Sequence, residues 1–265
     1  FGPGMEQNLE MEMDIFPTNV ASVEDNINKG IVDMSMVDND MRGFPALDYL
    51  LNAKDAATTV ADFGTDNPNT RGEYTRAVVQ DLLGRIDATL AGWQDGYADT
   101  FSSNPSTDAG SPLSLFFNSY EKVYEVIRRD RVSTRCFATG DEDLVEAFYG
   151  EFSAELAKAN VDAFHRIFNG TDQSGNNRKG LDDLLNFLDA QNANGEPLAQ
   201  AIDDQFAVAQ TAVNSLTDPL SDLCEQDAQS ITDSETEMQK LIPLMKNDAV
   251  SALQIRITFQ DSDGD

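Results

Sequence analysis

Apolar residues recur at steps of three and four along much of this chain, the spacing that places them on one face of an α-helix. The longest run predicts one helix from Leu144 to Phe168, which Gly170 would stop. Its apolar positions are Leu144, Val145, Phe148, Tyr149, Phe152, Leu156, Phe164 and Phe168. Two later runs predict further closely packed helices: Leu181, Leu184, Leu185 and Leu188, then Leu198, Ile202, Phe206, Val213 and Leu216.

Strand patterns are nearly absent, and the predicted fold class is all-α. Alternation typical of a strand occurs only from Leu253 to Phe259, and this segment fits a final helix equally well. Pro112 and Pro197 stand where the first turn of a helix would begin, because proline suits that position.

The chain is predicted to form two helical-bundle domains, residues 1–103 and 104–265, joined through the linker Ser102–Ser111. Arg42-Gly43 and Lys179-Gly180 each precede a leucine-rich helical turn, a faint internal echo. An ancestral duplication and a chance similarity between two helix starts explain this echo equally well.

The charge of the chain excludes whole classes of partner. The 265 residues carry 47 acidic and 18 basic side chains, a formal net charge of −29. A nucleic-acid backbone would be repelled, and an anionic membrane surface is disfavoured for the same reason. The apolar share of 40% still allows a core, so the charge points to a well-solvated folded protein that attracts cations.

Cys136 and Cys224 are the two cysteines, and neither lies in a CxxC pair or near a histidine. A disulfide between them is the favoured interpretation and implies an oxidising compartment; two free thiols in a cytosolic protein are the alternative. No apolar run reaches the roughly 20 residues that span a bilayer. Because the chain begins at Phe1 without a signal peptide, we expect any signal to lie upstream.

Other candidate sites have ordinary structural explanations. His165 is the only histidine, which excludes a histidine dyad or a zinc held by several histidines, and a half-buried helix position is expected for it. Segments 172–176 and 261–265 resemble pieces of calcium loops without the terminal glutamate, and solvated loops are favoured. The one basic group is expected either to form local ion pairs or to bind a small anionic ligand. It comprises Arg128, Arg129, Arg131 and Arg135.

The segment Arg42 to Leu51, RGFPALDYLL, resembles the Gly-x-His-x-x-Glu signature of the imelysin family, which usually appears as something like GFHAIEYLL. The stretch from Phe1 to Pro17 and the acidic finish from Ile257 to Asp265 are also similar to the family's ends. The resemblance spans most of the chain, but only the motif is specific.

This resemblance implies two helical bundles related by duplication, a helical segment before Phe1, and a periplasmic or cell-surface setting with a lipid anchor. It also implies an association with iron uptake. The family carries the label of an M75-type metallopeptidase, yet its pattern lacks the HExxH arrangement that places two histidine ligands on one helical face.

The sequence departs from the family at the positions that would bind a metal. Pro45 replaces the motif histidine and has no ligand atom, while Asp48 replaces the glutamate with a shorter carboxylate. Zinc is therefore disfavoured, whereas iron or another hard cation stays compatible with Asp48. We predict no catalytic residue; Arg42, Gly43, Asp48 and Tyr49 are the predicted binding residues, with Asp48 as the metal ligand.

A plain helix start explains the same residues: Gly43 permits a positive φ, Pro45 suits a first turn, and Asp48 favours the helix dipole. The predicted function is thus an extracytoplasmic, non-catalytic imelysin-like binding protein. A metallopeptidase and an interaction module with a decayed site are the alternatives.

Overall fold

The structure, a computed structural model, describes residues 2–3, 9–64, 70–132, 136, 139–226 and 228–258. Over these residues the regular structure is helical, without strands and with two isolated β-bridges, Thr171 to Asn177 and Gln191 to Pro197. The all-α prediction is confirmed. No described helix combines the length and the apolar run that a bilayer crossing needs.

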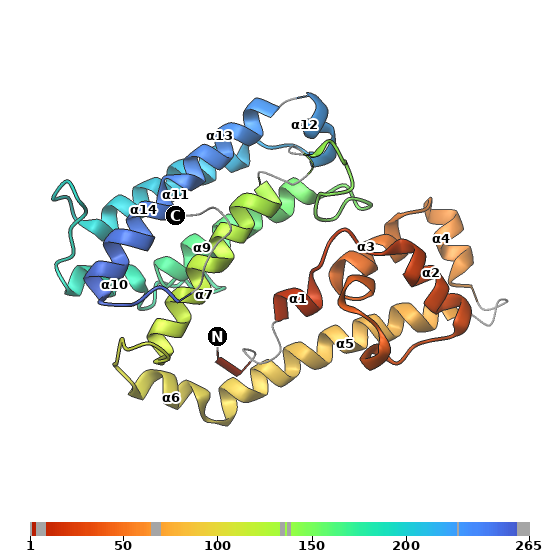
Figure 1. The fold of residues 1–265 in the computed structure, drawn as a ribbon, viewed down its shortest axis with the longest axis horizontal. Coiled ribbons are helices and arrows are strands. Elements are labelled where there is room, and N and C mark those ends of the chain that lie inside the picture. The colour runs from red at the N-terminus through yellow and green to blue at the C-terminus, as the bar shows by residue number, and fades with distance from the viewer. Residues whose placement is uncertain are drawn as a thin grey trace.

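The first group of helices, here the N-terminal unit (residues 9–92), packs around a small core (Figure 1). Its helices are α1 Leu9–Met13, α2 Val20–Lys29, α3 Gly43–Asn52, α4 Ala56–Asp62 and α5 Thr70–Gly92, with short 3-10 turns at Met34–Met36 and Asn39–Met41. Val23 of α2, Leu50 of α3, and Tyr74 and Val78 of α5 are at most 1% exposed. Helices α2 and α5 thus hold the motif helix α3 in place through their apolar faces.

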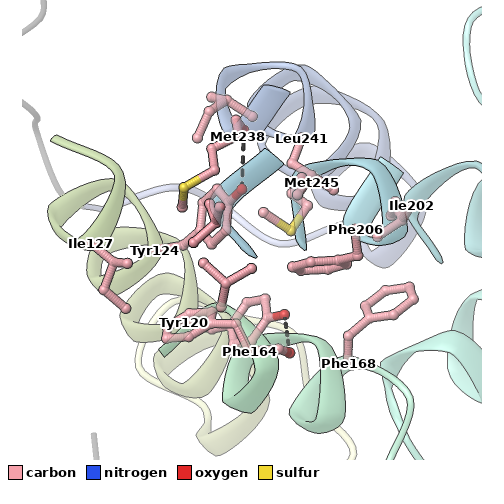
Figure 2. Close-up of a cluster of buried hydrophobic side chains, with 14 of the residues drawn as sticks. Tyr120, Tyr124, Ile127, Phe164, Phe168, Ile202, Phe206, Met238, Leu241 and Met245 are labelled. Atoms are coloured by element: carbon pink, nitrogen blue, oxygen red, sulfur yellow. Dashed lines mark hydrogen bonds between the residues drawn. The ribbon is translucent and has the colours of Figure 1, made fainter. Parts of the chain in front are cut away.

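The second group, here the C-terminal unit (residues 112–258), has a larger core. Its helical segments are α7 Pro112–Val126, the π-helix Ile127–Val132, α9 Ser153–Phe168, α10 Leu181–Phe187, α11 Leu198–Asn214, α12 Leu220–Gln226, α13 Ala228–Gln239, α14 Leu241–Pro243, the π-helix Leu244–Ala249 and α15 Val250–Leu253. Figure 2 shows aromatic side chains filling the space between these helices. The buried tyrosine hydroxyls are satisfied, because Tyr120 donates to the carbonyl of Phe164 (2.8 Å) and Tyr124 to that of Met238 (3.1 Å).

The two units are joined at one end of the molecule through the π-helix Trp93–Tyr97, helix α6 (Ala98–Ser103) and residues 104–111 (Figure 1). Ser111 caps α7, and Pro112 occupies its first turn as predicted. Pro197 likewise directly precedes α11. The buried clusters draw on residues 23–82 and 117–255 respectively, and the predicted division at residues 103 and 104 stays a prediction.

The predicted disulfide is confirmed: Cys136 is bonded to Cys224, with 6.1 Å between the two Cα atoms. The bond joins the segment after the π-helix Ile127–Val132 to α12 and closes a loop with a sequence separation of 88. That loop contains residues 139–152, which approach the motif helix.

The helix predicted from Leu144 to Phe168 is wrong in its first half, because α9 begins only at Ser153. Residues 141–152 form turns, and Ala147 and Glu151 adopt positive φ values of 52° and 57°. The second half and its end near Gly170 follow the prediction. The helices predicted around Leu181 and Leu198 are both present, as α10 and α11.

Contacts with α3 explain why residues 141–152 are not helical. The backbone N–H of Tyr149 donates to Asp48 (2.9 Å). Gly150 lies so close to Asp48 and Phe152 that an added Cβ would overlap the ring of Phe152. These contacts across about a hundred residues override the local helical spacing.

The segment after α15 is neither the strand nor the helix that the sequence allowed, as far as it is described. Helix α15 ends at Leu253, and Gln254 has a left-handed conformation (φ 54°). Asn118 of α7 then satisfies the backbone, donating to the carbonyl of Arg256 (3.1 Å) and accepting from the N–H of Thr258 (2.7 Å). Phe259 lies outside the described residues.

The two glycines of the internal echo have similar neighbours. A Cβ at Gly43 would overlap the carbonyl oxygen of Met13, the last residue of α1, and a Cβ at Gly180 would overlap that of Phe168, the last residue of α9. Their backbones differ, since φ is 83° at Gly43 and −114° at Gly180. The duplication stays a prediction.

Candidate functional site

Arg42, the residue before α3, is held by the turns that precede it. Its guanidinium donates to the carbonyl of Met34 (3.0 Å) and to the amide oxygen of Asn39, and lies 3.7 Å from Asp81 of α5. The side chain is 10% exposed. These contacts give Arg42 a structural role in fixing the entry to α3.

Gly43 begins α3 with a φ of 83°, a conformation that L side chains rarely adopt. It also lies against the Met13 backbone, so both conformation and space require glycine here. The helix-start interpretation of the motif is therefore supported at this residue.

Tyr49 faces the core of the N-terminal unit. Its hydroxyl donates to Glu24 of α2 (2.6 Å), the Arg71 guanidinium lies 5.3 Å from its ring centroid, and the Tyr149 ring packs edge-on at 5.3 Å. Burial and the hydrogen bond to Glu24 raise the pKa of Tyr49 to about 12, so the hydroxyl stays protonated. Its observed contacts tie together α2, α3, α5 and the turn at Tyr149.

Asp48 points the other way, toward the C-terminal unit, and the residue is 9% exposed. One carboxylate oxygen accepts from the Tyr149 N–H (2.9 Å) and the other from the side-chain amide of Asn52 (2.9 Å). Both donors are neutral. Among the described ion pairs, none involves Asp48, so its negative charge has no lysine or arginine partner.

A cavity of about 460 Å³ lies beside Asp48, between the motif helix and the C-terminal unit. Helix α3 supplies one wall, and residues 146–152 with α9 supply the other. Its volume falls in the range of small-molecule sites. The described lining residues are Asp14, Phe44, Pro45, Leu47, Asp48, Leu51, Asn52, Glu146, Ala147, Phe152, Leu156, Ala159 and Asn160.

Of the predicted binding residues, only Asp48 lines this cavity, whereas Arg42, Gly43 and Tyr49 support the helix that carries it. Pro45 occupies the wall at the position of the motif histidine. The binding and metal roles of these residues stay predictions. Among the described residues, no three His, Cys, Asp or Glu side chains gather as a metal ion would require.

Two further acids at the cavity share an arginine that connects the units. Arg131 contacts Asp14 (2.7 Å) and Glu146 (3.1 Å), and its guanidinium lies 5.1 Å from the Phe16 ring centroid. Burial raises the pKa of Asp14 to about 7 despite the opposing effect of Arg131, and nearby Glu146 adds to the rise. Asp14 is therefore partly protonated near neutral pH.

Asp14 and Glu146 could not be predicted from the sequence, because no local pattern marks them and they are more than a hundred residues apart. Arg131 was part of the predicted basic group. Its other described members also form ion pairs, Arg128 with Glu235 (3.0 Å) and Arg129 with Asp130 (3.0 Å). The ion-pair alternative is thus the one observed for these three arginines, and Arg135 lies outside the described residues.

The remaining candidates have structural contacts. His165 is half-buried on α9, as predicted: its ring stacks on Phe206 and contacts Asp203 (2.6 Å) and Gln210 (3.2 Å). In the loop 172–176 the Asp172 carboxylate accepts hydrogen bonds from its own loop, including the N–H of Asn176 (2.9 Å). Segment 261–265 lies outside the described residues.

Together the fold and the cavity define a class: an all-helical protein whose motif helix faces a ligand-sized cleft between two units. The chain belongs to the imelysin family, because the family model described as Imelysin (Peptidase_M75) matches residues 1–245. A comparison with curated proteins found no match.

Two solved structures share the fold. One, from Parabacteroides distasonis, is described as an iron-regulated protein A precursor; it is 14% identical with a TM-score of 0.72, and the match covers 96% of this chain and 77% of that one. The other, an imelysin-like protein from Psychrobacter arcticum, is 16% identical with a TM-score of 0.69, and the match covers 98% and 76% of the two chains.

Proposed function

We propose that this protein is an extracytoplasmic ligand-binding member of the imelysin family that serves iron acquisition without hydrolysing peptides. The main support for this proposal is the cavity of about 460 Å³, which is lined by Asp48 of the family motif. A ligand that entered it would contact α3, residues 146–152 and α9 together, and so would bridge both units.

Two observations support a setting outside the cytoplasm. The Cys136–Cys224 disulfide fits an oxidising compartment, and one structural neighbour is described as an iron-regulated precursor. Periplasmic or cell-surface placement, with a lipid anchor upstream of Phe1, is the finer form of this proposal. The same neighbour's description supports the link to iron.

The residues at the motif argue against peptide hydrolysis. A catalytic zinc needs three protein ligands and an open position, but Pro45 offers no ligand atom at the histidine position. The only histidine, His165, lies on α9, and its ring contacts Asp203 and Gln210 of α11. Asp48 therefore binds a ligand in this proposal and does not activate a water molecule for hydrolysis.

The test is native mass spectrometry of protein purified from its source, in the wild type and in Leu51→Trp. Leu51 lines the cleft and is 48% exposed, so tryptophan can fill the cleft without entering a core. Val208→Trp on α11 is the matched control, since Val208 is also 48% exposed and does not line the cleft.

The wild type and Val208→Trp should retain a bound molecule that Leu51→Trp lacks, and all three should leave denatured casein intact. Cleavage of casein by the wild type that Leu51→Trp abolishes would restore the metallopeptidase. Retention of the same molecule by Leu51→Trp would place the ligand outside the cleft and contradict the proposal.

A further inference from the structure

We propose that the ligand of the cleft is an organic cation with an apolar body, whose positive group pairs with Asp48. This inference rests on the proposed function, because it names the chemical class of molecule that the same cleft binds. It differs from a bare metal ion, which the motif of the family would suggest.

The uncompensated charge of Asp48 is the first argument. A carboxylate taken out of water needs a counter-charge, or its desolvation is not repaid. Asp48 is 9% exposed, and its hydrogen-bond donors among the described residues are the neutral groups of Tyr149 and Asn52. The nearby cation, Arg131, is paired with Asp14 and Glu146 instead. A positive group on the ligand would supply the missing counter-charge.

The charge of the lining is the second argument. Among the described residues of the lining, the ionisable ones are the acids Asp14, Asp48 and Glu146, and none is a lysine, arginine or histidine. The whole chain adds a net charge of −29. An anionic ligand would meet repulsion both at long range and on contact, whereas a cation would be attracted.

The apolar walls are the third argument, and they exclude a bare ion as the best occupant. Phe44, Leu51 and Phe152 are 51%, 48% and 37% exposed, and they expose this apolar surface together at one cavity. Covering them with an apolar body would remove this surface from water. A hard metal ion would leave this surface exposed to water and would need several oxygen ligands. Of the described carboxylates in the lining, Asp48 alone has no cationic partner.

The experiment titrates matched probes into the full chain by calorimetry at pH 7.5 and low salt. The probes are 2-phenylethylamine (cation with apolar body), 2-phenylethanol (neutral analogue), phenylacetate (anion) and ethylamine (cation without the body), with Mn²⁺ and Fe³⁺-citrate as metal probes. We expect 2-phenylethylamine to bind at least about tenfold more tightly than each of the other probes.

Asp48→Asn removes the charge and keeps the shape, so it should weaken the amine at least about tenfold and leave the alcohol unchanged. Asp162→Asn is the matched control: it makes the same change in net charge on α9, at a side chain that is 58% exposed and outside the cleft. It should leave the affinity for the amine unchanged.

Leu51→Lys provides a second route that keeps both hydrogen bonds of Asp48. Residue 51 lies one turn after Asp48 on α3, so its ammonium would compete with the ligand cation. We expect Leu51→Lys to abolish binding of the amine, and uncharged Leu51→Met to keep it within about threefold.

Equal or tighter binding of phenylacetate or of 2-phenylethanol would overturn the cation assignment, as would an amine affinity unchanged in both Asp48→Asn and Leu51→Lys. Tight Mn²⁺ or iron binding that Asp48→Asn removes would replace it with a metal site. In both cases a cleft ligand sensitive to Leu51→Trp would still support the proposed function, so the two failures are distinguishable.

Discussion

Removing the disulfide should destabilise the protein strongly, because it closes a long loop. Replacing Cys136 and Cys224 by alanine frees a loop with a sequence separation of 88 in the unfolded chain. The chain-entropy relation gives about 15 cal/mol/K for a loop of this length, or about 4.6 kcal/mol at 25 °C. For a protein of this size each kcal/mol corresponds to about 2–4 °C, so the Tm should fall by roughly 9–18 °C.

Urea denaturation followed by circular dichroism measures this free energy of unfolding, with the reduced wild type as the control. The double variant and the reduced wild type should lose similar stability, since both lack only the cross-link. A loss below about 1 kcal/mol in both would refute the argument from loop entropy. It would show that residues 136–224 stay restricted in the unfolded state without the bond.

Gly43→Ala should cost more than about 2 kcal/mol, because its Cβ would overlap Met13 at a positive φ. Gly30→Ala has a φ of 67°, but its Cβ would make only an ordinary contact with Thr70, so it should cost about 1 kcal/mol. Urea denaturation of both variants separates the cost of the overlap from the cost of the positive φ. Asp14 has a pKa raised to about 7, so the folded state holds a proton that the unfolded state releases above about pH 4, and stability is lost as the pH rises to about 7. Relative to Asp14→Asn, the wild type should therefore lose up to about 1.4 kcal/mol per pH unit in that window and none above it, and parallel curves from pH 4 to 7 would contradict this. Glu121 is fully buried without a hydrogen-bond partner for its carboxylate oxygens, and burial raises its pKa well above the usual range. Glu121→Gln should thus gain stability over the wild type as the pH rises from 5 to 8. A Tm difference between the two proteins that stays constant over this range would contradict the raised pKa of Glu121.

Much of the C-terminal unit could be predicted from the sequence, because its helices bury regular apolar faces. Ile202, Phe206 and Val213 of α11 are fully buried at the predicted spacing. The failure at residues 144–152 has a physical cause: the same apolar residues fit a helix, but Tyr149 and Gly150 pack against α3. Spacing along the chain contains no information about a partner a hundred residues away.

In the candidate site, too, some residues could be predicted from the sequence and others could not. Asp48 could be found because a family motif marks it, and the resemblance also identified Pro45 as the departure. Asp14 and Glu146 could not, because each gains its role only when folding brings it to Arg131. Arg42 and Tyr49 belong to the same motif, yet their hydrogen bonds to Met34 and Glu24 lie inside the N-terminal unit, a distinction that a sequence pattern does not contain.

The most direct test of the cleft as a ligand site is a crystal structure of the protein bound to 2-phenylethylamine. The proposal predicts the ammonium within hydrogen-bond distance of the Asp48 carboxylate, with the phenyl ring against Phe44, Leu51 and Phe152. An amine bound elsewhere on the protein, or a metal ion coordinated by Asp48 in its place, would contradict it.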